Sequence, residues 1–380
     1  MRVVVAMDSF KGSLSAVQAC EAVGRGLRAA CPEAHVRLVP MADGGEGTAA
    51  TILATSRGEW VDIEVTGPLP SMRVRGGYAW LPDRGPGALV EMASASGLEL
   101  LRPDQLDPMA ATSLGTGEQL AAAFARCPAR AWLAIGGSAT VDGGTGAARA
   151  LGWRFLDEID REVELGGAGL ERIRTIAPPP SGIGLEVELQ VLCDVDNPLL
   201  GERGAARVFG PQKGATPAMV ERLEAGLATL ADAVERDLGK DVRGLPGGGA
   251  AGGLGAGAVA FFDAALVSGI GAVMEASGLH GALVGADWVV TGEGRFDEQS
   301  LDGKVVSGVL AAAERAGCRV AVVAGSVDRT VAGASDPRVD ALEVASPSDV
   351  SLAEALVRAA ELVEAAARRL GARLGVRSEP

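Results

Sequence analysis

Histidine is almost absent from this sequence of 380 residues, which contains only His35 and His280. So few imidazole groups give poor support to a Ser-His-Asp or Cys-His mechanism of nucleophilic catalysis. The five cysteines are scattered and include no C-x-x-C pair, which favours free thiols and a reducing compartment. The apolar run at the N-terminus is too short for a signal peptide, and no run approaches the roughly 18 residues of a transmembrane helix. We therefore expect a soluble protein of the cytoplasm.

Basic and aromatic residues are also scarce. The 35 Lys and Arg residues are outnumbered by 49 Asp and Glu residues, so the formal net charge is −14. This balance argues against non-specific binding to nucleic acids or anionic membranes. Aromatic residues make up 3% of the chain and hydrophobic residues 48%, so the core must consist mainly of Ala, Val and Leu. Such a composition is typical of α/β enzymes with tight turns between strands and helices.

The two ends of the sequence share one pattern, in which short β-branched strands alternate with amphipathic helices. We expect strands at 2–6, 36–39, 288–291, 319–324 and 341–344, and helices at 14–27, from 48, from 305 and at 351–374. Ser13 or Ser15 is the expected N-cap of the first helix. This alternation predicts a doubly wound parallel sheet.

The middle of the sequence has a different texture. Extended, alternating segments at 60–66, 74–81 and 88–92 predict antiparallel strands, and a long amphipathic helix is expected at 217–238. The uncharged, glycine-rich stretch 244–257 favours close backbone packing or a hinge. We predict an α/β protein of two domains. A split, doubly wound, Rossmann-like domain of residues 1–66 and 283–380 is interrupted by an inserted mixed α/β domain of residues 67–282.

Five polar turns follow expected strands, which include 131–135 and 189–193, and four of these turns contain glycine. The five turns lie at 8–13, 43–48, 136–146, 193–198 and 291–304. One such turn alone is better explained by ordinary turn chemistry. The turns after parallel strands, however, emerge at the same edge of a sheet, which is where ligands bind. Five such turns, which together carry Asp, Lys and glycine, therefore predict a ligand site.

The turn at 136–146 has the chemistry of an anion site. Its glycines let backbone N–H groups converge, Ser138 and Thr140 add hydroxyl donors, and a following helix N-terminus adds about 0.3–1 kcal/mol. It matches neither G-x-x-x-x-G-K-[ST] nor G-x-G-x-x-G, so it indicates phosphate without indicating a particular nucleotide. Lys11, between Phe10 and Gly12, is either a solvated surface residue or a cation for a carboxylate or a transferring phosphoryl group.

Carboxylates occupy the same turns, at Asp8, Asp43, Asp194, Glu293 and Asp297. Oxygen ligands in a chain with few histidines suit Mg²⁺ rather than zinc. A further turn at 209–214, with Lys213, is expected to be exposed, as a plain surface turn or as a ligand loop.

Eight segments together make the sequence recognisable. They are MDSFKGSLSA, ADGGEGT, EMASASGL, TSLGTGE, GGSATVDGGTGAARALG, CDVDNPLLG, FGPQKGA and TGEGRFDEQSLDGK. In these segments and in their order, which covers nearly the whole chain, the sequence resembles the class I glycerate kinases. The resemblance implies a two-domain α/β enzyme with its active site in the cleft between the domains. It also implies ATP- and Mg²⁺-dependent phosphorylation of D-glycerate to 2-phosphoglycerate, a step in the metabolism of organic acids and carbohydrates. Formation of 3-phosphoglycerate and action on a related small hydroxy acid are the alternatives, and a homodimer is left open.

The resemblance also suggests residue roles, as hypotheses. Catalytic roles fall to Lys11, Arg295, Asp194 and Asp297, with Asp297 the first choice for accepting the hydroxyl proton. Asp8, Asp43 and Glu293 are candidate metal ligands, and Asp194 is an alternative to Asp8 and Asp43. The candidate substrate- and phosphate-binding residues are Ser9, Ser13, Gly44, Gly45, Gly137, Ser138, Thr140, Gly143, Gly144, Asn197, Gly292 and Gly294. Gln299, Ser300 and Lys304 are candidates for plain capping and surface roles.

Two other classes of protein share parts of this pattern. A nicotinamide-dependent dehydrogenase should carry G-x-G-x-x-G after the first strand, and residues 8–13 do not match it. A solute-binding protein would also have two α/β lobes, but it usually carries an export signal.

Overall fold

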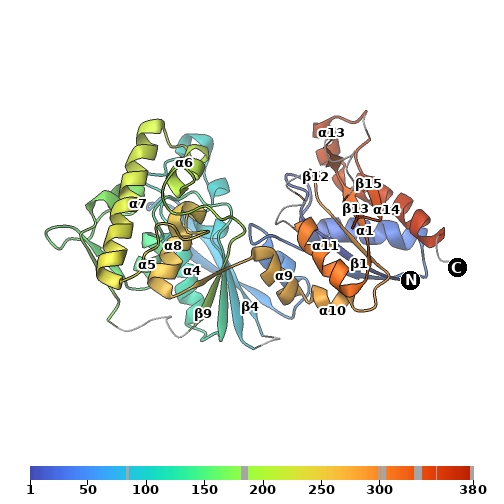
Figure 1. Ribbon diagram of the computed structural model, residues 1–380, viewed down its shortest axis with the longest axis horizontal. Coiled ribbons are helices and arrows are strands. Elements are labelled where there is room, and N and C mark those ends of the chain that lie inside the picture. The colour runs from blue at the N-terminus through green and yellow to red at the C-terminus, as the bar shows by residue number, and fades with distance from the viewer. Residues whose placement is uncertain are drawn as a thin grey trace. The chain divides into compact units, whose positions relative to one another are not determined.

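The computed structural model describes residues 1–82, 85–180, 187–297, 300, 305–328, 336–347 and 349–376, and it divides into two compact units (Figure 1). Unit 1 comprises Met1–Asp43, Ala50–Ser56 and Ile270–Pro380, and unit 2 comprises Gly44–Ala49 and Arg57–Gly269. Each contains parallel strands with helices packed against them, so the expected α/β fold class is confirmed. In the described ranges, no helix is both long and apolar enough to cross a lipid bilayer.

Unit 1 is built on a five-stranded parallel sheet in the order β15-β13-β11-β1-β2. Its elements are β1 (Arg2–Met7), α1 (Ala16–Ala30), β2 (His35–Leu38), α9 (Gly269–Ser277), α10 (Leu279–Leu283), β11 (Trp288–Gly292), β12 (Arg295–Phe296), α11 (Val305–Ala316), β13 (Arg319–Ala324), β14 (Ser326–Val327), β15 (Ala341–Val344), α13 (Leu352–Val357) and α14 (Ala359–Val376). Counted along the chain, the strands stand in the order 2-1-3-4-5, which reverses direction between β1 and β11. Ligands of open α/β sheets bind at such a reversal, outside the carboxyl ends of the strands.

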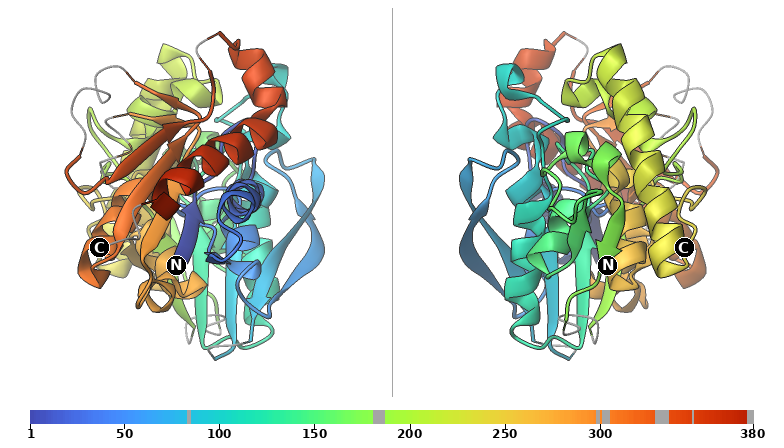
Figure 2. Two further views of the ribbon diagram at one scale, coloured as in Figure 1. Left: turned by 90° about the vertical axis from the view of Figure 1, so that its right-hand side faces the viewer. Right: turned by 90° about the vertical axis from the view of Figure 1, so that its left-hand side faces the viewer.

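Both faces of this sheet are covered, which explains the unbroken apolar run in β1. Val3, Val5 and Met7 belong to the core beneath α1 and α14, two helices that lie side by side in Figure 2. Successive side chains of a strand point to opposite faces, so Val4 and Ala6 face the other way, where α10 and α11 pack. Both layers of helices therefore bury β1, which lies between β11 and β2 in the interior of the sheet.

The first and last helices of unit 1 test the expected boundaries. Ser15 is the N-cap of α1, because its hydroxyl accepts a hydrogen bond from the backbone N–H of Gln18. The single helix expected at 351–374 is wrong, since Arg358 leaves the helical conformation (φ −97°, ψ 12°) and separates α13 from α14. Ser351 caps α13 in the same way as Ser15 caps α1.

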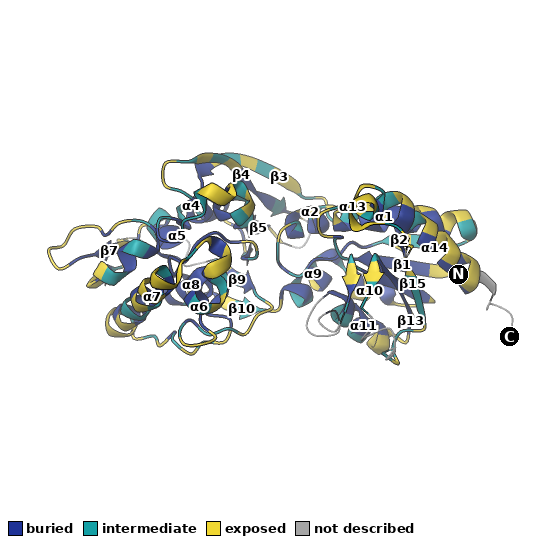
Figure 3. Cartoon of the chain, turned by 90° about the horizontal axis from the view of Figure 1, so that it is seen from above, coloured by how far each residue is buried: buried dark blue, intermediate teal, exposed yellow. Residues whose placement is uncertain are grey.

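Unit 2 is built on a six-stranded sheet in the order β10-β9-β6-β5-β4-β3. Short 3₁₀ turns separate some of its elements, and α2 (Thr48–Leu53) has residues in both units. The other elements of unit 2 are β3 (Glu59–Thr66), β4 (Arg73–Leu81), β5 (Gly87–Glu91), α3 (Ala93–Ser96), α4 (Leu114–Phe124), β6 (Arg130–Ala134), α5 (Thr145–Ala150), β7 (Arg154–Leu156), β8 (Thr175–Ala177), β9 (Glu188–Leu192), α6 (Ala205–Phe209), η4 (Pro211–Lys213), α7 (Pro217–Leu238), α8 (Ala250–Phe262) and β10 (Ala265–Val267). β3, β4 and β5 are antiparallel, as expected, whereas β5, β6, β9 and β10 are parallel. Exposed residues line parts of β3 and β4 at the edge of the sheet (Figure 3).

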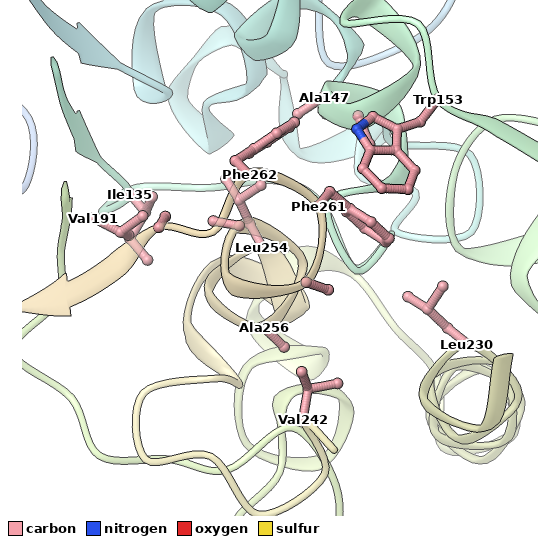
Figure 4. Packing of buried hydrophobic residues seen from close by; sticks show 14 of the residues in the cluster. Ile135, Ala147, Trp153, Val191, Leu230, Val242, Leu254, Ala256, Phe261 and Phe262 are labelled. Carbon is pink, nitrogen blue, oxygen red and sulfur yellow. The ribbon is translucent and has the colours of Figure 1, made fainter. Parts of the chain in front are cut away.

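The few aromatic residues of the chain are concentrated in the core of unit 2. The ring of Phe261 lies 5.3 Å from those of Trp153 and Phe155, and Leu230 and Leu254 belong to the same cluster (Figure 4). Such aromatic pairs contribute roughly 0.5–1.5 kcal/mol beyond the burial of their surface.

The glycine-rich stretch provides close backbone packing. Ala251, Gly252 and Gly253 have positive φ angles and interrupt α8 near its start. A Cβ atom on Gly252 would lie 1.9 Å from the carbonyl oxygen of Thr140, and the carbonyl oxygen of Gly252 accepts a hydrogen bond from the N–H of Gly143. Only glycine allows the backbone of α8 to approach the 136–146 turn so closely.

The predicted domain boundaries at 66 and 283 differ from the unit boundaries of the structure. β3 pairs along its whole length with β4 and therefore belongs to unit 2. α9 and α10 precede residue 283, but they fall almost wholly within unit 1, where α10 packs against β1 and α11.

Candidate active site

Three of the predicted acids meet at the reversal of the unit 1 sheet. Met7 and Gly292 are partners in the pairing of β1 with β11, so Asp8 and Glu293 follow at neighbouring strand ends. The N–H of Asp8 donates to the carbonyl oxygen of Gly292 at 2.9 Å, which fixes this register. Asp43 follows the extension of β2 and lines the same cavity as Asp8 and Glu293. The expectation that turns after parallel strands bring their acids together is therefore met in unit 1.

The electrostatics of this cluster favour a cation. Burial, together with the nearby charges of Asp43 and Glu293, raises the pKa of Asp8 from its ordinary value of 3.8 to about 7. Lys11 acts in the opposite direction on the same carboxyl group. In the described part of the chain, no group of three His, Cys, Asp or Glu side chains is arranged to hold a metal ion by itself. This arrangement fits Mg²⁺, which is usually held by one or two carboxylates together with substrate phosphates.

A cavity of about 900 Å³ opens over these acids within unit 1. Its polar lining contains eight of the predicted site residues, namely Ser9, Lys11, Ser13, Asp43, Glu293, Gly294, Arg295 and Asp297, besides Asp8. Its remaining lining is largely apolar and comes mainly from α13, α14 and Phe10. The cavity is within the range of roughly 300–1,000 Å³ that small-molecule sites occupy in proteins.

The turn at 8–15 positions two of these residues. The hydroxyl of Ser13 donates to the carbonyl oxygen of Phe10 at 2.9 Å, and the N–H of Ser9 donates to the carboxylate of Asp8 at 2.6 Å. Phe10 itself is buried in the unit 1 core. Lys11, at the tip between Phe10 and Gly12, is exposed at the cavity.

Arg295 is held by acids. Its guanidinium donates to Asp328 at 2.7 Å and lies 3.6 Å from the carboxylate of Asp297. The strand pair β12 and β14 brings these groups together, and the N–H of Asp297 is fixed by the hydroxyl of Ser300 at 2.9 Å. The Arg295 side chain is 66% exposed, so these contacts orient it without burying it. Gln299 and Lys304, which were expected to begin the next helix, lie outside the described residues.

Gly292 and Gly294 have different surroundings. A Cβ atom on Gly292 would lie 1.8 Å from the carbonyl oxygen of Val323, so this glycine is required by the packing of the strands. A Cβ atom on Gly294 would lie 3.4 Å from the Cα atom of Phe10, so this glycine faces the turn at 8–15.

The glycines of ADGGEGT lie against the carboxyl edge of the unit 2 sheet. A Cβ atom on Gly44 would lie 2.8 Å from the Cβ atom of Leu192, and one on Gly136 would lie 2.7 Å from the Cα atom of Gly45. The same segment contacts the sheet once more just after these glycines, where the N–H of Ala49 donates to the carboxylate of Glu91 at 2.6 Å. Glu91 is buried at the end of β5, and burial raises its pKa.

The predicted phosphate turn divides into two halves. In the first half, the carbonyl oxygen of Gly137 and the N–H of Ala139 bond to the segment 96–98. The N–H groups of Gly137 and Ser138 donate to no other group in the part of the chain that the structure describes. These two donors are therefore available to an anion.

In the second half of the turn, most backbone N–H groups already donate to groups of the protein. Asp142 is fully buried and accepts hydrogen bonds from the N–H groups of Gly144 and Gly146 and from the hydroxyl of Ser113. The N–H of Gly143 donates to Gly252. The donors of Gly143 and Gly144, which were predicted to bind phosphate, thus already have partners, and these glycines serve the packing against α8. Helix α5, which follows, has only six residues and adds little dipole.

The turn at 209–214 is exposed at Pro211, Gln212 and Gly214, as predicted, whereas Lys213 is buried. Its side chain turns inward and is only 2% exposed, because its amino group donates to the hydroxyl of Ser138 at 2.7 Å and to the carbonyl oxygen of Thr140 at 2.7 Å. Burial lowers the pKa of Lys213 from 10.5 to about 7. The hydroxyl of Thr140 points to the carbonyl oxygen of Ala251 at 3.4 Å.

Asp194 and Asn197 lie in the turn after β9. Asp194 accepts hydrogen bonds from the hydroxyl of Ser268 and the N–H of Gly269, both at 2.9 Å, so it ties the ends of β9 and β10 together. The side-chain amide of Asn197 donates to the carbonyl oxygen of Arg203 at 2.8 Å and fixes a loop.

Comparison with known proteins adds to this geometry. The model of the glycerate kinase family matches residues 3–375. The chain belongs to the glycerate kinase family. It is 43% identical to a glycerate kinase of Halalkalibacterium halodurans over 97% of each chain. It is 40% identical to the glycerate 2-kinase of Escherichia coli, over 99% of this chain and 98% of the other.

A solved structure agrees with the assignment. A glycerate kinase 2 crystal structure from Salmonella typhimurium LT2 matches with a TM-score of 0.87 and 43% identity, over 99% of this chain and 98% of the other. The chain is thus a kinase, and the fold expected from the resemblance to glycerate kinases is confirmed.

Four residues of this glycerate kinase family member were not named as site residues from the sequence, although the turn that contains Lys213 was considered as a ligand loop. Asp142 organises the phosphate turn, Lys213 supports it, Glu91 holds the ADGGEGT glycines and Asp328 holds Arg295. Glu91 and Lys213 lie in EMASASGL and FGPQKGA, two segments that carried the resemblance. Asp142 lies within the phosphate turn, and Asp-Gly-Gly is ordinary turn sequence, so the sequence did not distinguish Asp142 from a turn residue.

Proposed function

We propose that this kinase transfers the γ-phosphoryl group of ATP to a hydroxyl of D-glycerate and yields 2-phosphoglycerate, with Mg²⁺ as the cofactor. The observation that carries the proposal is the cluster of Asp8, Asp43 and Glu293 with Lys11 at the reversal of the unit 1 sheet. A group of acids in mutual repulsion, with Lys11 beside it, is suited to a magnesium–phosphate complex. The name of the Escherichia coli relative favours the 2-phospho product.

Each group has a part in this reaction. When bound, Mg²⁺ would neutralise charge on the phosphate oxygens, and Asp8, Asp43 and Glu293 are the residues that would hold it. Lys11 and Arg295 would neutralise the glycerate carboxylate or the transferring group. Asp297, 3.6 Å from Arg295, would accept the proton of the attacking hydroxyl. Such transfer depends mostly on positioning and charge, so little help from a base is needed.

In unit 2, the N–H groups of Gly137 and Ser138 would bind phosphate oxygens. Gly44 and Gly45 would bring the backbone close to this edge, and Asp194 and Asn197 would support it through the contacts described above. The placement of the site between two domains stays a prediction from the resemblance.

The decisive experiment measures ADP release with ATP, Mg²⁺ and D-glycerate, followed by phosphorus NMR of the product. We expect release that depends on glycerate and a product resonance of the 2-phosphate. A resonance of the 3-phosphate would show that the product is 3-phosphoglycerate. Faster turnover of another hydroxy acid would show that this acid, and not D-glycerate, is the substrate. No release with any hydroxy acid would overturn the proposal.

The surroundings of the enzyme are part of the proposal. All five cysteines are free, which fits the reducing environment of the cytoplasm. A homodimer stays a prediction, which the mass of the protein in solution would test.

A further inference from the structure

Lys213 is a buried amino group without a carboxylate partner in the described structure. Its hydrogen-bond partners are the hydroxyl of Ser138 and the carbonyl oxygen of Thr140, and no ion pair of the described residues includes it. Among the described residues, Asp142 is the one charged group that acts on it, and the carboxylate of Asp142 already accepts hydrogen bonds from Ser113, Gly144 and Gly146. Buried charges in proteins are normally paired, so the protonated form of Lys213 lacks a counter-charge.

The type of residue is informative as well. The chain contains four lysines, at 11, 213, 240 and 304, among 35 basic residues, so arginine is its usual cation. An arginine remains protonated in proteins, whereas a buried lysine can gain and lose its proton near neutral pH. A neutral side chain could donate the same two hydrogen bonds at a lower desolvation cost. We therefore infer that the function of Lys213 depends on an amino group that can become charged.

The phosphate turn supplies that role. The N–H groups of Gly137 and Ser138 have no partner in the described part of the chain, and Ser138 also receives the hydrogen bond of Lys213. Because Lys213 donates to Ser138, the hydroxyl hydrogen of Ser138 must point to another acceptor. An anion at this turn would receive that hydrogen together with the two N–H groups.

We propose that Lys213 is the positioning residue of the 136–138 turn and the buried counter-charge for a phosphate group of the nucleotide bound there. This inference rests on the proposed function. The turn places the donors on the phosphate, and Lys213 acts through Ser138 and Thr140 rather than by touching the substrate. At pH 8, Lys213 is mostly neutral before binding, because burial lowers its pKa to about 7. A bound anion favours the charged form, so nucleotide binding takes up a proton.

Proton uptake is the direct readout. Isothermal titration of the wild-type protein with ADP and Mg²⁺ at pH 8, in two buffers that differ in ionisation enthalpy, gives the number of protons taken up. We expect close to one proton per ADP, and none in Lys213→Met. Titration with glycerate alone is expected to show no uptake. Uptake with glycerate and none with ADP would overturn the assignment to phosphate, and no uptake with either would overturn the counter-charge.

Kinetics separate positioning from a purely structural role. Lys213→Met is expected to raise the KM for ATP about 10- to 100-fold, since a hydrogen bond from a charged group is lost, while the KM for glycerate stays within about twofold. Ser138→Ala is expected to raise the KM for ATP by a smaller factor and to retain proton uptake. A lower melting temperature of Lys213→Met with an unchanged KM for ATP would show a structural role and refute the proposal.

Lys240 offers a matched control. Its amino group also donates to two backbone carbonyl groups, of Val259 and Ala260, but it is paired with Asp263 at the end of α8. Lys240→Met is expected to leave the KM for ATP and the proton uptake unchanged. If Lys240→Met raised the KM for ATP and abolished proton uptake as Lys213→Met does, the specific role of Lys213 would be refuted. If the wild-type protein neither binds ADP nor phosphorylates glycerate, the proposed function fails and this inference fails with it. Normal turnover without proton uptake refutes the inference alone.

Discussion

The carboxyl edges of the two sheets are built from opposite kinds of chemical group. In unit 1 the edge is built from side chains, with three acids close enough to raise the pKa of Asp8 to about 7. In unit 2 the edge is built from backbone, with glycines at 44, 45, 136 and 137 and a buried lysine beneath them. The first edge has unbalanced negative charge and suits a cation, and the second has unused donors and suits an anion.

This difference teaches how an acidic protein can act on anionic substrates. A net charge of −14 repels phosphate at long range, and salt screens that repulsion beyond roughly 8 Å. Attraction can therefore be local, through amide N–H groups on one edge and a metal ion on the other. The predictions below test whether the two edges have these separate tasks.

Asp8→Asn is expected to have the largest effect. Loss of one carboxylate of the acidic cluster should lower kcat by about 10²–10³-fold and raise the Mg²⁺ concentration needed for half-maximal rate. Enzyme assays over a range of Mg²⁺ concentrations measure both. Asp62→Asn removes an exposed acid that pairs with Arg75 and serves as the control, with activity close to wild type. Equal Mg²⁺ requirements in Asp8→Asn and wild type would remove Asp8 from the metal site.

The same variant has a stability effect whose sign follows from its pKa. Because the pKa of Asp8 is raised in the folded state, the folded protein holds a proton between about pH 4 and 7 that the unfolded chain releases. Stability is therefore lost as the pH rises through this window. Without metal, Asp8→Asn should raise the free energy of unfolding at pH 8 by roughly 2–4 kcal/mol and have little effect at pH 4. Denaturant unfolding with a chelator measures the difference, and a constant difference at all pH values would contradict the assignment.

Asp297→Asn is expected to come next in size. It should lower kcat by well over tenfold and leave the affinity for ATP unchanged, because the carboxylate is proposed to accept the hydroxyl proton. Steady-state kinetics, together with titration of ADP, measure the two quantities. Near-normal turnover would remove Asp297 from the mechanism and would mean that the transfer needs no base from this loop.

Gly252→Ala tests the backbone construction of the unit 2 edge. A Cβ atom there would lie 1.9 Å from Thr140, so the turn at 136–146 must shift, and we expect a loss of more than about 3 kcal/mol of stability and a higher KM for ATP. Gly239 also has a positive φ angle, but nothing lies within 4 Å of its Cβ position. Gly239→Ala should therefore cost only about 1 kcal/mol and leave kinetics unchanged. Similar losses in the two variants would mean that the φ angle alone decides the cost.

Asn197→Ala is expected to have the smallest effect. The lost hydrogen bond to Arg203 should reduce stability by about 1 kcal/mol, and kcat and KM should stay within about threefold of wild type. Thermal unfolding and kinetics measure these changes. A large change in the KM for either substrate would give Asn197 a direct role in binding.

The sequence predicted those features that depend on local pattern and strand direction. The apolar run of β1, the cap at Ser15 and the long helix α7 follow from residues close in sequence. The meeting of Asp8 with Glu293 followed from the rule that parallel strands end at one edge. Features that depend on distant partners were not predictable in this way.

Lys213 and Gly143 show why. Nothing near Lys213 in sequence distinguishes a buried amine from one on a surface turn, because its partner Ser138 is 75 residues away. The N–H of Gly143 looked available in sequence, yet it is bonded to Gly252 across the core of unit 2. Burial and hydrogen-bond satisfaction are tertiary properties, and they decided which parts of the predicted phosphate turn remain open.

The order of the strands in unit 1 has a consequence for biosynthesis. Val3 pairs with Trp288, and α1 packs against α14 at the far end of the chain, where a Cβ atom on Gly26 would lie 2.3 Å from the carbonyl oxygen of Glu364. During synthesis, β1 and α1 thus remain without these partners until β11 and α14 have been made. Unit 2 is complete once Gly269 has been made, so we expect it to fold first while β1 and α1 remain without partners. Until then the apolar strand β1 is exposed to aggregation, which is the condition that chaperones relieve in nascent chains.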